Sequence, residues 1–117
     1  MSDDWIKLGL IFKPDSRVPW MKKYAWVPTP MHLNENIFRV FFSGRNHENL
    51  SQTGFFDFNL NSKKILATSS EAVLRLGSLG LFDDSLAVGC SIVHHENYIY
   101  MYYVGWTQTK KTRYLPQ

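Results

Sequence analysis

The chain carries the same hairpin pattern twice, with corresponding residues 61 positions apart. Residues 37–43 and 98–104 are rich in β-branched and aromatic side chains, and each run follows an apolar segment and a short polar turn. Polar turns between two such runs are typical of β-hairpins. In an alignment without gaps the turn and a closing glycine coincide, with Val27 on Val88, Glu35 on Glu96, Asn36 on Asn97 and Gly44 on Gly105. We interpret this pattern as a true internal repeat, with Glu35 and Glu96 as turn residues and not as catalysts.

Two further strands are expected between the copies. Residues 53–60 alternate apolar and polar side chains, and a turn at Asn61 and Ser62 leads into residues 63–68. Residues 69–76 have a local helix-capping pattern, but Gly77 and Gly80 follow at once, which favours an extended crossover. Four consecutive antiparallel strands in about 60 residues are typical of a β-propeller blade.

The sequence therefore predicts an all-β fold of antiparallel, four-stranded β-propeller blades. We expect one partial domain over residues 1–117: an N-terminal strand at 5–12 that would complete the last blade, a first blade at about 27–68, and the first half of a second blade at about 86–104. A five-bladed ring of such units needs about 300 residues. The chain holds about one and a half blades and ends at 114–117, where a third strand should begin, so we expect it to be truncated.

Charge and cysteine content narrow the classes of partner. The net charge of +3 is mild and no basic stripe is interleaved with aromatic residues, so nucleic acid is not an expected partner; the basic cluster at 110–113 is interpreted as a solvated end. The N-terminus lacks a signal-peptide pattern and no apolar run approaches the roughly 18 residues that would span a bilayer. We therefore expect no membrane partner and a cytoplasmic location. The single cysteine, Cys90, fits a reducing compartment, and its apolar neighbours predict a buried, unreactive thiol.

Five short motifs carry a resemblance to a known group of proteins. They are Trp5-x-Lys7-Leu8-Gly9, Val27-Pro28-Thr29-Pro30, the stretch FRVFFSGR at 38–45, Gly80-Leu81-Phe82-Asp83-Asp84 and Tyr102-Tyr103-Val104-Gly105-Trp106. In their order and spacing the chain resembles the five-bladed β-propeller glycosidases, a glycoside hydrolase family 43/32/130-like superfamily that includes arabinanases, xylosidases, invertases and mannoside phosphorylases. It is most similar to glycosidase-like proteins of bacterial surface-polysaccharide gene clusters. The resemblance covers nearly all of this chain and about a third of such a protein.

The resemblance implies a site at one end of the central channel. Here it would bring together residues 24–26, residues 44–47, and residues 82–84 with residues 106–108 beside them. Glycosyl hydrolysis or transfer needs two carboxyl groups. The resemblance implies an acidic residue at the start of the first inner strand, but residues 26–30 contain none, and the later glutamate that would serve as acid would lie beyond residue 117.

Asp83 and Asp84 are the remaining candidate catalytic residues. Two adjacent carboxylates would raise the pKa of one of them if both were sequestered, which suits acid–base chemistry. The alternative is that they belong to a solvated turn.

The candidate substrate-binding residues are Trp26, Arg45, Asn46, His47, Trp106 and Gln108. Trp26 and Trp106 would stack on sugar faces, or else pack between blades. Arg45 would clamp a carboxylate, a phosphate or a pair of hydroxyl groups, or else be a surface arginine at the exit of a strand. His47 would hydrogen-bond a sugar or act as a base, although loop histidines are often idle.

No metal or cofactor is predicted. His94 and His95 are adjacent on a strand, so their side chains point to opposite faces and cannot share a metal ion. We expect a glycosidase-like protein that acts on or binds a carbohydrate or glycosylated small molecule, in surface-polysaccharide metabolism. Whether it is an enzyme stays open; the alternatives are a non-catalytic carbohydrate-binding propeller and an inactive truncated fragment. The strand edge at 98–104 is expected to favour self-association.

Overall fold

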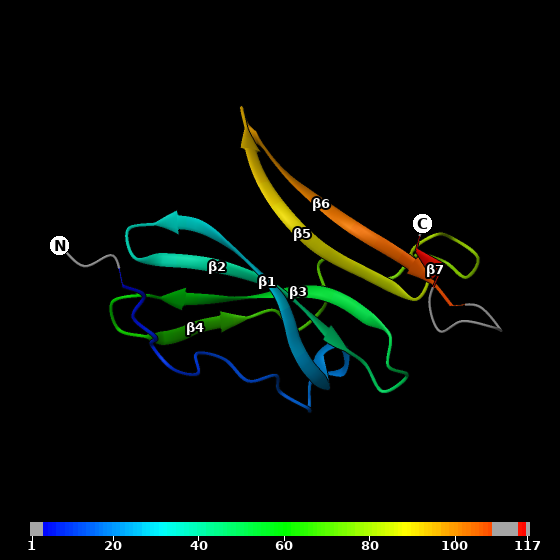
Figure 1. Cartoon of the computed structure of the whole chain (residues 1–117), viewed down its shortest axis with the longest axis horizontal. Coiled ribbons are helices and arrows are strands. Elements are labelled where there is room, and N and C mark those ends of the chain that lie inside the picture. Colours follow the sequence, from blue (N-terminus) through cyan, green and yellow to red (C-terminus); the bar gives the residue numbers. More distant parts are fainter. Residues whose placement is uncertain (1–3, 109–114, 117) are drawn as a thin grey trace.

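The computed structural model describes residues 4–108 and 115–116, and this part of the chain is all-β (Figure 1). A short 3-10 helix precedes the strands, and the elements are η1 (Pro19–Met21), β1 (Lys23–Asn34), β2 (Ile37–Arg45), β3 (Ser51–Asn59), β4 (Lys64–Thr68), β5 (Leu86–His95), β6 (Tyr98–Thr107) and β7 (Leu115–Pro116). The prediction of an all-β fold is confirmed. The basic cluster at 110–113 lies outside the described residues.

Both predicted hairpins form, and their turns are equivalent. The last pair of the first hairpin is Asn34 with Ile37, and the last pair of the second is His95 with Tyr98, which are the corresponding positions of the repeat. Glu35 and Glu96 follow these pairs in the left-handed conformation, with φ of 42° and 54°. The two glutamates are therefore turn residues, as predicted.

β1 to β4 form a four-stranded antiparallel meander. β2 and β3 pair without interruption from Ile37 with Asn59 to Arg45 with Ser51, and β3 also pairs with β4. The strands expected at 53–60 and 63–68 are thus present with small shifts of their ends.

The segment between β4 and β5 is an extended crossover, as predicted. It runs back along β3, where the Ser69 N–H donates to the Phe55 carbonyl over 2.9 Å and the Thr53 N–H donates to the Leu74 carbonyl over 3.2 Å. β5 then joins β3 through a single parallel pair, Ser51 with Leu86. The resulting sheet is open, and Figure 1 shows the β5–β6 hairpin leaving the β1–β4 sheet at an angle.

A buried hydroxyl joins the hairpin to the meander. The Thr53 Oγ1 atom donates to the Ala87 carbonyl and accepts the Gly89 N–H, each over 3.0 Å, and it lies 3.0 Å from the Ser43 Oγ. Ser43, Thr53 and Ala87 are fully buried. Side chains this small let the β5–β6 hairpin approach the meander closely enough for a side-chain hydroxyl to bind the β5 main chain.

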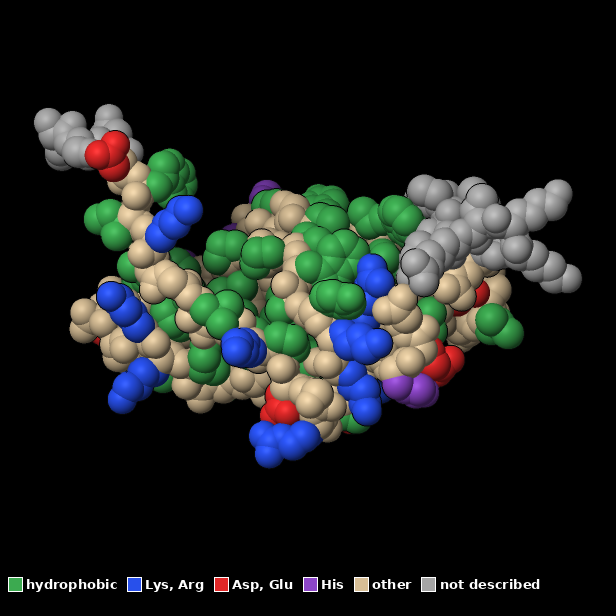
Figure 2. Space-filling model, turned by 60° about the horizontal axis from the view of Figure 1, so that its bottom comes forward, with side chains coloured by type: hydrophobic (Ala, Val, Ile, Leu, Met, Phe, Trp, Pro, Cys, Tyr) green, Lys and Arg blue, Asp and Glu red, His purple; other side chains and the backbone are tan. Residues whose placement is uncertain are grey.

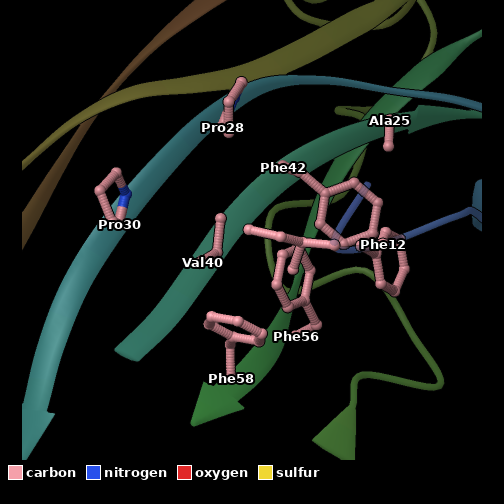
Figure 3. A pocket seen from close by; sticks show the side chains of 9 residues that line it. Phe12, Ala25, Pro28, Pro30, Val40, Phe42, Phe56 and Phe58 are labelled. Carbon is pink, nitrogen blue, oxygen red and sulfur yellow. The ribbon is translucent and has the colours of Figure 1, made fainter. Parts of the chain in front are cut away.

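The hydrophobic core covers the other face of the meander. It consists of Trp20, Met21, Phe42, Phe56, Phe58 and Ala72. Figure 3 shows the rings of Phe12, Phe42 and Phe56 close together above β2 and β3, with Pro28 and Pro30 of β1 to one side. The ring of Phe12 stacks on Phe56 with 4.4 Å between centroids, so the N-terminal segment covers part of this core.

The structure has no strand at residues 5–12, contrary to the prediction. This segment pairs with no described strand, and it is anchored by the ring of Phe12 instead of by a ladder of hydrogen bonds. The prediction had assigned its partner edge to a last blade, and the described strands offer no such edge. Large apolar side chains remain at the surface here and elsewhere, and Figure 2 shows them gathered on one face with Lys and Arg side chains around them.

The repeated glycine has the same structural reason in both copies. A Cβ atom on Gly44 would lie 2.9 Å from the Met21 Cα, and one on Gly105 would lie 2.5 Å from the Phe82 ring. Met21 and Phe82 are themselves 61 residues apart. In each copy the segment that enters the hairpin therefore crosses the end of its second strand, and only a glycine leaves room for it.

Candidate functional site

Three of the predicted substrate-binding residues line one hollow. Trp26 of β1, Arg45 of β2 and Trp106 of β6 surround a space of about 320 Å³, which we call the site hollow. Its other walls are apolar side chains and one thiol, from Val27, Leu86, Val88, Cys90 and Val104. The hollow lies where the β1–β2 and β5–β6 hairpins meet, so neither copy of the repeat forms it alone.

An irregular start to β1 presents Trp26. The pairing of β1 with β2 shifts register on both sides of Trp26, and Tyr24 and Val27 have φ of 62° and 51°. A left-handed conformation is costly for a β-branched residue such as Val27, and bulges re-aim side chains next to sites. The Trp26 indole N–H is covered from solvent and has no hydrogen-bond partner in the described structure.

The guanidinium of Arg45 lies close to two aromatic rings. Its Cζ atom is 5.4 Å from the centroid of the Tyr24 ring and 5.6 Å from that of Trp26. Its Nη1 donates to the Asn49 Oδ1 over 3.2 Å. Tyr24, Ala25, Trp26 and Arg45 line a second hollow of about 380 Å³, which shares Trp26 and Arg45 with the site hollow.

Asn46 and His47 belong to the loop after β2. The Asn46 Oδ1 accepts the N–H groups of Glu48 and Leu50 over 2.9 and 3.0 Å, so this oxygen shapes the loop. The imidazole of His47 is exposed, and its Nε2 lies 3.7 Å from the Glu48 carboxylate. Neither residue is among those that line the site hollow, and their part in substrate binding stays a prediction.

Asp84 holds together the loop before β5. Its carboxylate accepts hydrogen bonds from the Thr107 hydroxyl over 2.7 Å, the Gly80 N–H over 2.9 Å and the Ser85 hydroxyl over 2.9 Å. These three bonds hold the pKa of Asp84 below its ordinary value, because they stabilise the charged form. A lowered pKa suits a permanent carboxylate and does not suit a proton donor at neutral pH.

Asp83 is buried, with 7% of its surface exposed, and the Tyr103 hydroxyl donates to its Oδ2 over 2.9 Å. Burial, and then this bond to Asp83, raise the pKa of Tyr103.

Gln108 is exposed and its backbone N–H donates to the Ser85 hydroxyl over 3.0 Å. Asp83, Asp84 and Gln108 do not line the site hollow. The catalytic role of the two aspartates stays a prediction, and the structure gives them contacts that order a loop.

The exposure of Cys90 differs from the sequence-based prediction. The residue was expected to be buried, but it is exposed and lines the site hollow. The reason is a bulge: the pairing of β5 with β6 shifts between Gly89 and Ser91, on either side of Cys90. An apolar sequence context predicted burial, and no sequence signal marks this bulge.

The described residues contain neither a cluster of metal ligands nor a membrane-spanning helix. Within residues 4–108 and 115–116, no three His, Cys, Asp or Glu side chains are grouped closely enough to hold a metal ion. Among the same residues, no helix has the length and apolar character needed to cross a membrane.

Comparison with known proteins finds two relatives in Mycobacterium tuberculosis. No family model matches the sequence, and no solved structure matches it. The relatives come from strains CDC 1551 / Oshkosh and ATCC 25618 / H37Rv, and both are described as uncharacterised proteins. Each is 39% identical to this chain over an alignment of 104 residues, and the match covers 87% of this chain and 34% of the relative. The chain therefore spans about a third of the length of the curated relatives it matches.

Proposed function

We propose that this chain is part of a carbohydrate-binding β-propeller protein of the glycosidase-like kind, and that a sugar ring binds in the site hollow. The observation that carries the proposal is that Trp26, Arg45 and Trp106, from three different strands, line one space. Indole faces pack on the apolar C–H faces of sugars, and a guanidinium donates to hydroxyl groups. Small-molecule sites commonly combine apolar walls with a few polar groups, as this hollow does.

The arrangement of the strands supports the propeller part of the proposal. β1 to β4 form an antiparallel meander of the size of one blade, and β5–β6 repeats its first hairpin after 61 residues. The relatives support the number of blades. Because an alignment of 104 residues covers 34% of each relative, each relative is about 300 residues long, which is close to five units of 61 residues.

The described part supports binding better than catalysis. Glycosyl hydrolysis or transfer needs two carboxyl groups close to the scissile bond. No carboxylate is among the described residues that line the site hollow or its neighbour. We therefore propose binding for this part of the protein, so that any hydrolysis or transfer would depend on carboxyl groups from other parts of the whole protein. We further propose a cytoplasmic location, since Cys90 has no second cysteine in this sequence with which to pair.

Cys90 offers a direct test of sugar binding. It is the single cysteine of the sequence, it is exposed, and it lines the site hollow. A glycan selected on an array with the 117-residue chain should slow the alkylation of Cys90 by iodoacetamide severalfold at saturation, because the bound sugar covers the thiol. Trp106→Ala should abolish this protection, since it removes the stacking surface.

The matched control is Trp5→Ala, which removes an indole that is 97% exposed and does not line the hollow. This variant should keep full protection. The proposal fails if the array shows no glycan binding, or if a bound glycan leaves the alkylation rate of Cys90 unchanged.

A further inference from the structure

Arg45 differs from the other described arginines in lacking a carboxylate partner. Arg17, Arg39 and Arg75 each pair with an acidic side chain, the closest atoms being 2.7 to 2.9 Å apart. Arg45 has no acidic oxygen within 4.0 Å among the described residues, and the side chain that it contacts by hydrogen bond is the neutral amide of Asn49. Its partner across the ladder is Lys23, which is also cationic. Two like charges at paired positions are unfavourable unless an anion lies between or beside them.

The backbone of β1 beside Arg45 is strained at two residues. Tyr24 and Val27 both adopt the left-handed conformation, and the rings of Tyr24 and Trp26 flank the guanidinium. Strain of this kind persists only where the surrounding structure fixes the backbone, and it is frequent at ligand-binding sites. Arg45 also lines both hollows, so a ligand bound in either hollow would lie beside this side chain.

We propose that Arg45 binds the anionic group of an acidic sugar, either the carboxylate of a uronic acid or a phosphate group. This inference rests on the proposed function and names the class of its substrate. The planar fork of a guanidinium matches the two oxygens of a carboxylate or phosphate and binds them by two parallel hydrogen bonds. The indoles of Trp26 and Trp106 would hold the sugar ring, while Asn49 and the two flanking rings keep the guanidinium in place.

The test uses the 117-residue chain on an array of neutral, uronate-containing and phosphorylated oligosaccharides, followed by calorimetry of the best binders. Acidic glycans should bind at least about tenfold more tightly than neutral ones, since a hydrogen bond to a charged group is worth about that factor or more. Added NaCl should weaken the binding of the acidic glycans, because salt screens exposed charges. The uronate and phosphate arms show which anion the site prefers.

Variants assign the effect to Arg45. Arg45→Gln should reduce the affinity for acidic glycans to that for neutral ones, and Arg45→Lys should give an intermediate value, because lysine keeps the charge and loses the fork. Arg75→Gln, at an exposed arginine paired with Glu71, is the matched control and should have no effect. Circular dichroism of each variant verifies that the sheet is retained.

A titration with inorganic phosphate distinguishes failure of the anion site from failure of carbohydrate binding. If neutral glycans bind as tightly as acidic ones and Arg45→Gln changes neither affinity, the anion site is overturned and carbohydrate binding stands. If no glycan binds but phosphate shifts the NMR signal of the Arg45 side chain, carbohydrate binding and the acidic sugar as ligand are overturned, and only anion binding by Arg45 stands. If neither glycans nor phosphate bind, both are overturned.

Discussion

Asp84 shows how a single carboxylate can take a structural role at the position where catalysis was expected. Thr107 comes from β6, while Gly80 and Ser85 come from the crossover before β5, and all three donate to this one side chain. The carboxylate therefore closes its own loop through Gly80 and Ser85 and ties that loop to the end of β6 through Thr107, which is 23 residues away in the sequence. This explains why its surroundings favour the charged form.

The lowered pKa of Asp84 makes a prediction about pH. The pKa of Asp84 in the folded state lies below its pKa in the unfolded state, which is about 3.9. The ionised carboxylate therefore stabilises the fold in full above about pH 3.9, and this contribution is lost as the pH falls through the folded-state pKa. Thr107→Val removes the hydroxyl that contributes most and should raise the pKa of Asp84 towards its ordinary value. A carbon-13 NMR titration of the Asp84 carboxylate measures this directly.

The control for this titration is Thr68→Val, at an exposed threonine on β4. It should leave the titration of Asp84 unchanged. An unchanged pKa in Thr107→Val would show that the bond from Thr107 does not stabilise the carboxylate.

Side-chain environments were the least predictable part of the site. We predicted Trp26, Arg45 and Trp106 as binding residues because their side-chain types recognise sugars, and the structure brings the three together. The same reasoning did not predict that the Asn46 amide and the Asp84 carboxylate bind backbone N–H groups of their own loops. These bonds depend on loop conformation, which the order of residues does not reveal.

At the scale of elements, the closing glycines explain why the repeat is visible in the sequence at all. Gly44 and Gly105 are retained at equivalent positions because Met21 and Phe82, also at equivalent positions, cross the ends of β2 and β6. The crossing segment and the glycine together form one packing unit that occurs twice.

Alanine at these glycines should destabilise both hairpins. Gly44→Ala meets the main chain at Met21, and Gly105→Ala meets the Phe82 ring, so each should lower the free energy of unfolding by about 1–3 kcal/mol. Gly89→Ala is the matched control, because its new Cβ would meet the flexible end of the Met101 side chain, which can move. Urea unfolding followed by circular dichroism measures the three variants, and an equal cost for Gly89→Ala would contradict this explanation.

The elements that the sequence predicted correctly are those with local signals. Both hairpins and the β3–β4 turn follow from turn residues between alternating strands, a pattern that operates over a few residues. The strand expected at 5–12 required a distant partner, and the short helix η1 depends on packing of Trp20 and Met21 into the core. Neither has a local signal that decides it.

At the scale of the molecule, β6 leaves most of one edge open. Among the described residues β7 pairs with it only at Trp106 and Thr107, so residues 98–105 present unpaired main-chain groups on that side. Tyr98, Ile99 and Tyr102 are exposed beside that edge. Open edges with apolar side chains attract a further strand.

We therefore expect the 117-residue chain to associate reversibly as its concentration rises. Tyr102→Lys places a charge beside the edge and should return the mass measured by light scattering to that of the monomer, 13.7 kDa. The control Leu79→Lys changes a loop side chain that is 97% exposed and should leave the association unchanged. An association that both variants leave unaltered would place the interface elsewhere.

The hydrogen bonds of the Thr53 hydroxyl to β5 have a consequence for how the sequence of such a protein can diverge. Its hydroxyl binds the carbonyl of Ala87 and the N–H of Gly89, which are main-chain groups that every residue except proline supplies in full. The docking of β5 thus does not depend on the side chains that this strand turns towards the site hollow, such as Val88 and Cys90. Substitutions there can accumulate and alter which ligand is accepted while the position of the strand is inherited unchanged.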